Sequence, residues 1–162
     1  MRVYRVFERK HVALAFTGEG AQRFGGRWNS PGVAVVYAAS NFALALLEIM
    51  VNARRGRIPP DMAFCAVDVP DDVVIGAVQE SALPKGWHGS PVPPETQAIG
   101  DAFVRDGKTV GLWVPSAVSR IEQNMILNPN HADFSRLIIG TIQDVPVDER
   151  LQERTRKKKG VG

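Results

Sequence analysis

The alternation of hydrophobic and polar positions along the chain predicts a series of short strands. Apolar runs or period-two alternation, rich in Val, Ile and Tyr and bounded by turn residues, are typical of strands. The predicted strands are MRVYRVF (1–7), VAVVYAA (33–39), MAFCAVDV (62–69) and VVIGAVQ (73–79) around a turn at 70–72, TVGLWVPS (109–116), IEQNMILN (121–128) and FSRLIIGTIQDV (134–145).

The same pattern predicts two clear helices. The first contains NFALALLEIMVN (41–52) and extends to about Arg55, with Ser40 or Asn41 as the N-terminal cap and Gly56 as the stop. The second is PETQAIGDAFVRDG (94–107), which has Pro near its start and Gly after its last turn.

Strands and helices that do not alternate regularly indicate an α+β fold with a mixed or antiparallel sheet and flanking helices. The regular βαβαβ alternation of a dinucleotide-binding Rossmann fold is missing. Two stretches rich in Gly or Pro, 17–32 and 80–94, are predicted to be loops.

Length and charge refine this picture. A chain of 162 residues with 44% apolar and 23% charged residues suits one domain, which we place at 1–150. Residues 151–162 hold five Lys or Arg and one Glu, a net of +4, so the rest of this +3 chain is close to neutral. This basic C-terminal tail is interpreted as a solvated end. A weak nucleic-acid contact is the alternative, but no aromatic residues are interleaved with the charges, so direct nucleic-acid binding is not expected.

Cysteine content and hydropathy bear on the compartment. The single cysteine, Cys65, lies in an apolar segment and is predicted to be a small buried side chain. Neither a signal peptide nor a membrane-spanning segment is indicated by the pattern. We therefore expect a cytoplasmic protein without membrane association.

Glu48 stands in the middle of the apolar segment 41–52. A helix that is apolar on all sides is expected to be buried, and a Glu is rarely buried without a partner. Glu48 therefore faces solvent through a gap, pairs with a buried Arg or Lys, or faces a cleft. Asn52, one helical turn later, is expected to lie beside it.

The segment QRFGGRWNSPG (22–32) places two glycines, Gly25 and Gly26, directly before Arg27. Its spacing matches neither a Walker loop nor GxGxxG. Glycines allow backbone N–H groups to approach an anion, and a guanidinium can then bind a phosphate in two-pronged fashion. The alternative is a simple turn beside a surface Arg. Trp28 could stack on a ligand ring or pack in the core.

Ser116 and His131 raise the question of a Ser–His–acid hydrolase. The chain has no GxSxG elbow and no recognisable triad order, so His131 is interpreted as a loop or cap residue. The three histidines show no metal-ligand spacing, and we expect neither a metal nor a cofactor.

Taken together, these segments resemble the motifs of the RES-domain family, the toxins of bacterial RES–Xre toxin–antitoxin pairs. The matching residues are Arg27 in FGGRWNSPG, Tyr37 in VVYAAS, Glu48 in ALLEIMV and Ser116 in VPSAVSRIEQNMILNPNHADF. The resemblance covers roughly residues 2–145. It implies a split sheet similar to that of ADP-ribosyltransferases and an activity on NAD, which is a substrate rather than a redox cofactor.

The resemblance also implies roles for individual residues. Arg27 would bind the diphosphate or ribose of NAD, Tyr37 would line the nicotinamide site, Glu48 would serve the nicotinamide ribose, and Ser116 would complete the pocket. Other substrate contacts are expected from the glycine-rich motif and from the helix after it: Gly25, Gly26, Trp28, Asn29 and Asn52. One position departs from the family pattern, because a His is common where this chain has Asn52.

The chemistry of these residue types suits NAD cleavage. Breaking the nicotinamide–ribose bond passes through an oxocarbenium-like sugar, which a carboxylate stabilises. Nicotinamide leaves as a neutral base, so one Glu is sufficient. Three hypotheses follow: hydrolysis or phosphorolysis of NAD, transfer of ADP-ribose to a protein, and, because of Asn52, a weakly catalytic module that binds a partner. An Xre-type antitoxin is the expected partner, and homo-oligomerisation is left open.

Overall fold

A computed structural model gives the fold of the chain and describes residues 1–53 and 56–151. Arg55, the predicted last residue of the first helix, and residues 152–162 of the predicted basic tail lie outside the described residues. The strands are β1 (Arg2–Glu8), β2 (Val36–Ala39), β3 (Met62–Asp68), β4 (Ile75–Ala77), β5 (Gly111–Pro115), β6 (Gln123–Leu127), β7 (Ile138–Ile139) and β8 (Gln143–Asp144).

Within the described residues, three α-helices accompany these strands: α1 (Glu19–Phe24), α2 (Phe42–Asn52) and α3 (Pro94–Asp106). Short 3-10 helices lie at Arg9–Leu14, Glu80–Ala82, Ala132–Arg136 and Glu149–Leu151. No helix among the described residues combines the length and the apolar character that crossing a bilayer requires.

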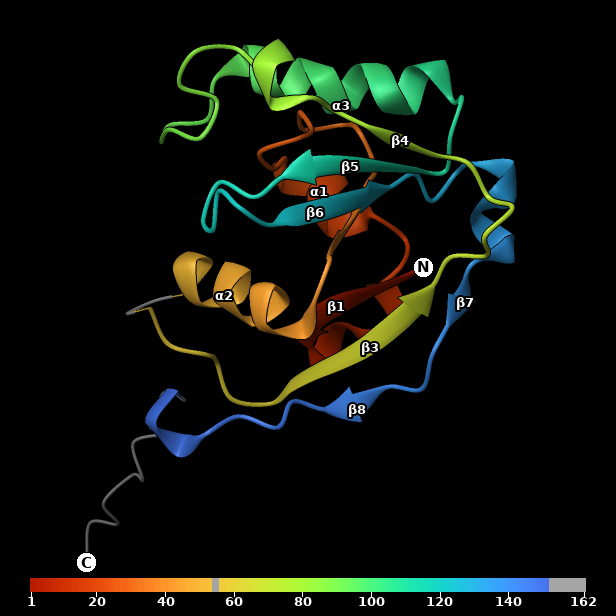
Figure 1. Cartoon of the computed structure of the whole chain (residues 1–162). Coiled ribbons are helices and arrows are strands. Elements are labelled where there is room, and N and C mark those ends of the chain that lie inside the picture. Colours follow the sequence, from red (N-terminus) through yellow and green to blue (C-terminus); the bar gives the residue numbers. More distant parts are fainter. Residues whose placement is uncertain (54–55, 152–162) are drawn as a thin grey trace, which may run out of the picture.

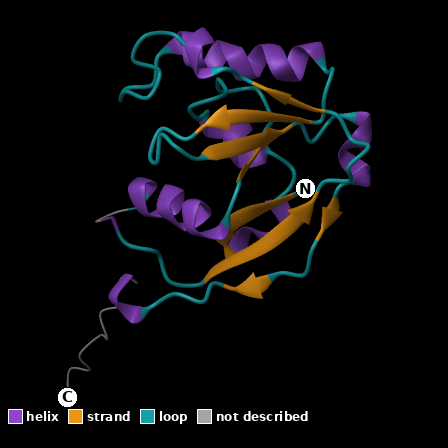
Figure 2. Cartoon of the chain, in the orientation of Figure 1, coloured by secondary structure: helices purple, strands orange, loops and turns teal. Residues whose placement is uncertain are grey.

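The eight strands form one sheet in the order β4-β5-β6-β2-β1-β3-β7, and β8 also pairs with β3. Only β4 and β5 are parallel, and the other pairs are antiparallel. The two halves of the sheet join where β1 meets β2, through the single registered pair Tyr4 and Ala39. This narrow connection separates an upper and a lower group of strands in Figure 2. The predicted fold class, α+β with a mixed split sheet and flanking helices, is confirmed.

Three predicted local features need correction. Residues 17–32 are not all loop, because α1 forms between Gly18 and Gly25, both at positive φ. The predicted strand 73–79 is shortened to β4 (Ile75–Ala77), which lies beside β5 at one end of the sheet. The predicted single strand 134–145 is wrong. Its first residues belong to the 3-10 helix Ala132–Arg136, and two short strands, β7 and β8, lie on either side of Gly140.

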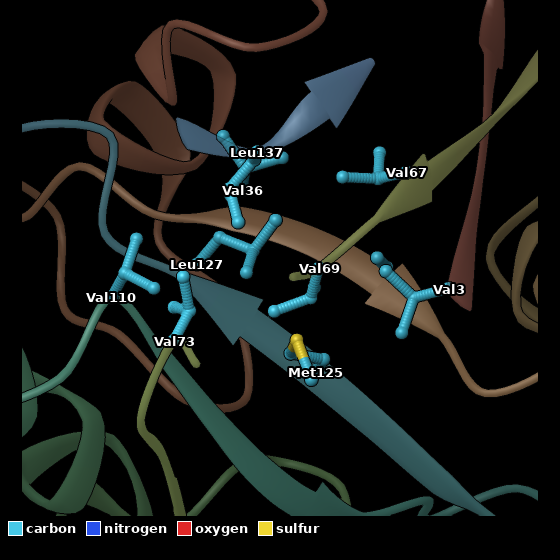
Figure 3. Close-up of a cluster of buried hydrophobic side chains, with 10 residues drawn as sticks. Val3, Val36, Val67, Val69, Val73, Val110, Met125, Leu127 and Leu137 are labelled. Atoms are coloured by element: carbon cyan, nitrogen blue, oxygen red, sulfur yellow. The ribbon is translucent and has the colours of Figure 1, made fainter. Parts of the chain in front are cut away.

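The main core lies where the two halves of the sheet meet. Val3 of β1, Val36 of β2, Val67 of β3 and Leu127 of β6 are fully buried in one cluster (Figure 3). These valines come from the predicted apolar runs, in which β-branched side chains pack well on a pleated surface. Cys65 is also fully buried, as predicted. The core therefore fixes β1 and β2 together, and the candidate site lies at their junction.

Helices α2 and α3 each cover one half of the sheet (Figure 1). Helix α2 packs against β1 and β2, and its N-terminus is capped by Asn41, whose side chain accepts a hydrogen bond from the Leu44 N–H at 2.9 Å. Helix α3 lies beside β5, where Ile99 and Phe103 pack on the cluster around Trp28. The two helices therefore pack on different halves of the sheet.

Candidate active site

A cavity of about 480 Å³ lies at the junction of β1, β2 and α2. Its volume falls within the range of about 300–1,000 Å³ that is typical of small-molecule sites. Arg27, Tyr37 and Glu48, which were predicted as catalytic, line it. So do four of the predicted substrate contacts: Gly25, Gly26, Trp28 and Asn52. The structure therefore brings together three residues that are far apart in the sequence.

Glu48 faces this cavity, so the cleft interpretation of its position is the correct one. Its Oε1 accepts hydrogen bonds from Ser116 Oγ at 2.8 Å and from Asn124 Nδ2 at 2.6 Å. Its Oε2 accepts none of the hydrogen bonds found within residues 1–53 and 56–151. One carboxylate oxygen is thus fixed by the protein, and the other remains available to a ligand.

The helix that carries Glu48 is less buried than its sequence suggested. Leu44 and Ala45 are the buried residues of α2, whereas Leu47 is 37% and Val51 60% exposed. The expectation that α2 is buried on all sides is therefore wrong. Its apolar composition instead provides both an inner face against β1 and an apolar border at the cavity, which Val51 lines.

Ser116 is fully buried and does not line the cavity. Its hydroxyl donates its proton to Glu48 and accepts hydrogen bonds from the N–H groups of Val118 and Ser119, both at 3.1 Å. A hydroxyl with all these partners is a positioning group for the carboxylate rather than a free nucleophile. His131 caps the following 3-10 helix and accepts a hydrogen bond from the Asp133 N–H, as its interpretation as a cap residue predicted.

Burial lowers the pKa of the Arg27 guanidinium, and the nearby negative charge of Glu48 partly offsets this shift. Its Nη1 donates to the carbonyl oxygens of Trp87 at 2.7 Å and Gly89 at 3.0 Å. Arg27 is therefore not a simple surface charge. It ties the 87–89 segment to the cavity. Its Nε and Nη2 donate none of the hydrogen bonds found in the described part of the chain, so these donors are available to a ligand.

The glycines before Arg27 serve close packing. Gly26 has no room for a side chain, because a Cβ there would lie 2.5 Å from the Tyr37 hydroxyl. The N–H of Gly25 donates to Ala21 O, and the N–H of Gly26 donates to Asn29 O. The expected N–H cradle for an anion is therefore wrong for these two residues, although both line the cavity.

The Tyr37 hydroxyl is held from two sides. It accepts a hydrogen bond from the Trp28 N–H at 3.0 Å and donates to Asn29 Oδ1 at 2.7 Å. Burial raises the pKa of Tyr37 well above its ordinary value, so the phenol stays neutral. Because the hydroxyl is occupied, Tyr37 offers its ring rather than a proton to the cavity.

Asn29 and Trp28 are parts of the scaffold. Asn29 is fully buried, does not line the cavity, and donates from Nδ2 to three backbone carbonyls. Its predicted role as a substrate contact is therefore wrong. Trp28 is 2% exposed and packs on Trp87 with ring centroids 5.8 Å apart, so it is a core residue with one edge at the cavity. Asn52 lines the cavity and donates to the backbone carbonyl of Glu48.

Two residues of the site were missed by the sequence reasoning. Arg5 of β1 lines the cavity, donates from Nη1 to Tyr37 O at 2.6 Å, and has a buried Nε without a hydrogen-bond partner in the described part of the chain. Burial lowers its pKa to about 10, so it remains a cation at neutral pH. Asn124 of β6 orients Glu48, and its Oδ1 is likewise buried without a partner there.

The profile that defines the RES domain matches residues 2–148. The chain belongs to the RES-domain family. A relative from Photorhabdus laumondii, named Toxin Res, is 36% identical over 93% of this chain and 97% of its own length. A second, from Sphingobium sp. strain YBL2 and named Prs ADP-ribosylating toxin, is 38% identical over 88% of this chain and 90% of its own.

A solved structure shares the fold of this RES-domain protein. A chain of the crystal structure of the M. tuberculosis MbcT–MbcA toxin–antitoxin complex superposes with a TM-score of 0.69. The match covers 89% of this chain and 83% of that chain, at 22% sequence identity. At this identity the likeness concerns the fold alone.

Proposed function

We propose that this RES-domain protein is a toxin that cleaves the nicotinamide–ribose bond of NAD by hydrolysis or phosphorolysis. The observation that carries the proposal is the state of Glu48, a carboxylate with one oxygen fixed by Ser116 and Asn124 and the other open to a cavity. A fixed anion beside a sugar stabilises the positive charge that develops as the glycosidic bond breaks.

The bond changes need little from the protein beyond this charge. The bond between ribose C1′ and the nicotinamide nitrogen breaks, and its electron pair neutralises the pyridinium. An oxygen of water or phosphate then bonds to C1′, and with water one proton is released. No general acid is required, which agrees with the neutral, hydrogen-bonded hydroxyls of Tyr37 and Ser116.

The remaining charges of the cavity suit the rest of the dinucleotide. Arg5 and Arg27 are two guanidinium groups beside a single carboxylate, Glu48, on the cavity wall. A guanidinium with free N–H donors binds phosphate oxygens in a directional way. We therefore assign the diphosphate of NAD to the region between Arg5 and Arg27.

A second candidate is transfer of ADP-ribose to a protein. It is favoured by one observation, the name of the Sphingobium relative, which describes an ADP-ribosylating toxin. The two reactions share bond cleavage at C1′ and differ in the acceptor. We further propose that the partner is an antitoxin of the Xre type and that the protein acts in the cytoplasm. The toxin–antitoxin complex that has the same fold supports an antitoxin as partner.

Product analysis tests the proposal and separates the acceptors. The purified protein is incubated with NAD labelled in the adenosine part, with and without inorganic phosphate, and the products are separated by chromatography and gel electrophoresis. We expect free nicotinamide together with ADP-ribose or, with phosphate, its 1-phosphate. Label retained on a protein band would establish transfer instead. An unchanged NAD concentration at stoichiometric protein would contradict both reactions. The hypothesis of a weakly catalytic module that binds a partner would then remain.

A further inference from the structure

A second cavity, of about 360 Å³, adjoins the cavity of Glu48. Arg5, Gly25 and Tyr37 line both cavities, so the two share a boundary. The remaining lining of the second cavity comes mainly from α1 and from the segments on either side of it. None of the roles assigned above uses this space.

The walls of the second cavity are apolar and include an exposed aromatic ring. Phe24 is 73% and Leu14 43% exposed, and Ala21 and Val35 line the same space. The guanidinium of Arg23 lies over the Phe24 ring, 5.2 Å from its centroid. A large ring kept in solvent at a cavity wall has the chemistry of a stacking surface for a planar heteroaromatic group.

The boundary between the cavities is cationic. Arg5 donates one hydrogen bond to Tyr37 O, and its buried Nε has no hydrogen-bond partner within the described residues. Arg5 is not paired with a carboxylate in the ion pairs and hydrogen bonds of residues 1–53 and 56–151. A ligand whose two ends carry rings and whose middle is anionic would find the Arg5 guanidinium as a hydrogen-bond donor at this boundary.

This order of chemistry matches a dinucleotide. The Glu48 cavity takes the nicotinamide ribose, the Arg5 boundary takes the diphosphate, and an apolar, ring-lined space follows. We propose that the second cavity is the subsite for the adenine of NAD, with Phe24 as its stacking platform. This inference rests on the proposed function, because it concerns the other end of the same substrate.

Gly20 allows the second cavity to be filled without disturbing the fold. It lines that cavity, and a Cβ at this position would meet no atom within 4 Å. Gly20→Leu is therefore expected to occupy the adenine space while α1 keeps its structure. Glu19→Leu places the same side chain one residue earlier on α1, outside both cavities, and is the matched control. Phe24→Ala removes the stacking ring.

The test measures kcat and KM for NAD, and the competitive inhibition constant of AMP, for each variant. We expect Gly20→Leu and Phe24→Ala to raise the KM for NAD by about five- to tenfold, as loss of base stacking does, with kcat little changed. The inhibition constant of AMP should rise in parallel. Nicotinamide mononucleotide lacks the adenosine part, so the preference for NAD over this probe should fall by the same factor.

Two results would overturn the subsite, and they are distinguishable. If wild-type protein consumes NAD and Gly20→Leu matches Glu19→Leu in KM and in AMP inhibition, the second cavity does not bind adenine, and the proposed function stands. If wild-type protein consumes no NAD, the proposed function fails and the subsite fails with it. Circular dichroism and a urea unfolding curve for each variant establish that the fold is retained.

Discussion

Glu48→Gln is expected to lower the rate of NAD cleavage by at least about 100-fold, which is the scale seen when one electrostatic stabiliser of a transition state is removed. The substitution removes the negative charge that we propose faces the ribose. Its amide oxygen can still accept the hydrogen bonds that Ser116 and Asn124 now donate to Oε1. The loss should therefore appear in kcat, with a small change in KM and in the free energy of unfolding.

The matched control for this variant is Glu95→Gln. Glu95 is an exposed residue in the first turn of α3 and does not line either cavity. Initial rates of nicotinamide release compare the two variants at equal protein concentration. A Glu48→Gln enzyme that keeps wild-type kcat would show that the carboxylate has no part in the reaction.

Gly100→Ala is expected to destabilise the protein by about 3 kcal/mol or more, the upper part of the range for overpacked sites. Gly100 of α3 packs against the backbone of Trp28, and a Cβ there would lie 1.7 Å from the Trp28 carbonyl oxygen. Two rigid backbones must then separate. The same helix anchors the glycine-rich motif through Gln97 Nε2, which donates to Gly26 O at 2.9 Å. Displacement of α3 should therefore also lower activity by moving Arg27.

Gly20→Ala is the control for the Gly100 variant, because both glycines lie in helices and one has open space. A Cβ at Gly20 meets nothing within 4 Å, so we expect a gain of about 0.4–1 kcal/mol from the reduced freedom of the unfolded chain. Urea unfolding midpoints measure both changes. Equal effects of the two substitutions would contradict the close contact between α3 and the Trp28 backbone.

The sequence allowed those parts of the fold to be predicted that local pattern determines. Most strands, the Asn41 cap and the helix around Glu48 follow from residue spacing and propensity alone. A cleft beside Glu48 was one of the three positions that the sequence suggested for a Glu in an apolar helix.

Pairing and side-chain direction could not be predicted in this way. The neighbours of β4 depend on which distant strand completes the sheet, and a period-two pattern does not encode that choice. The last predicted strand divides at Gly140, whose N–H donates to Ala66 O and where a Cβ would lie 3.0 Å from that oxygen. Such an interruption depends on a residue more than seventy positions away.

Arg5 shows the same limit for the site. Arg2 and Arg5 lie in the same strand, β1, and the sequence around them does not distinguish their roles. Arg2 forms an exposed two-pronged ion pair with Asp68, whereas Arg5 turns to the cavity and to Tyr37. Only the tertiary structure separates the two. Asn29 shows the opposite error. It belongs to the predicted motif, but its buried side chain hydrogen-bonds to three backbone carbonyls and to the Tyr37 hydroxyl.

The most direct test of the central claim is a crystal structure of the Glu48→Gln variant with NAD. We expect the nicotinamide ribose to lie within hydrogen-bond distance of the side chain at position 48, at about 2.6–3.2 Å. We also expect the diphosphate to contact Arg5 or Arg27. NAD bound elsewhere on the molecule, or with its nicotinamide ribose directed away from position 48, would contradict the claim that this cavity is the site of NAD cleavage.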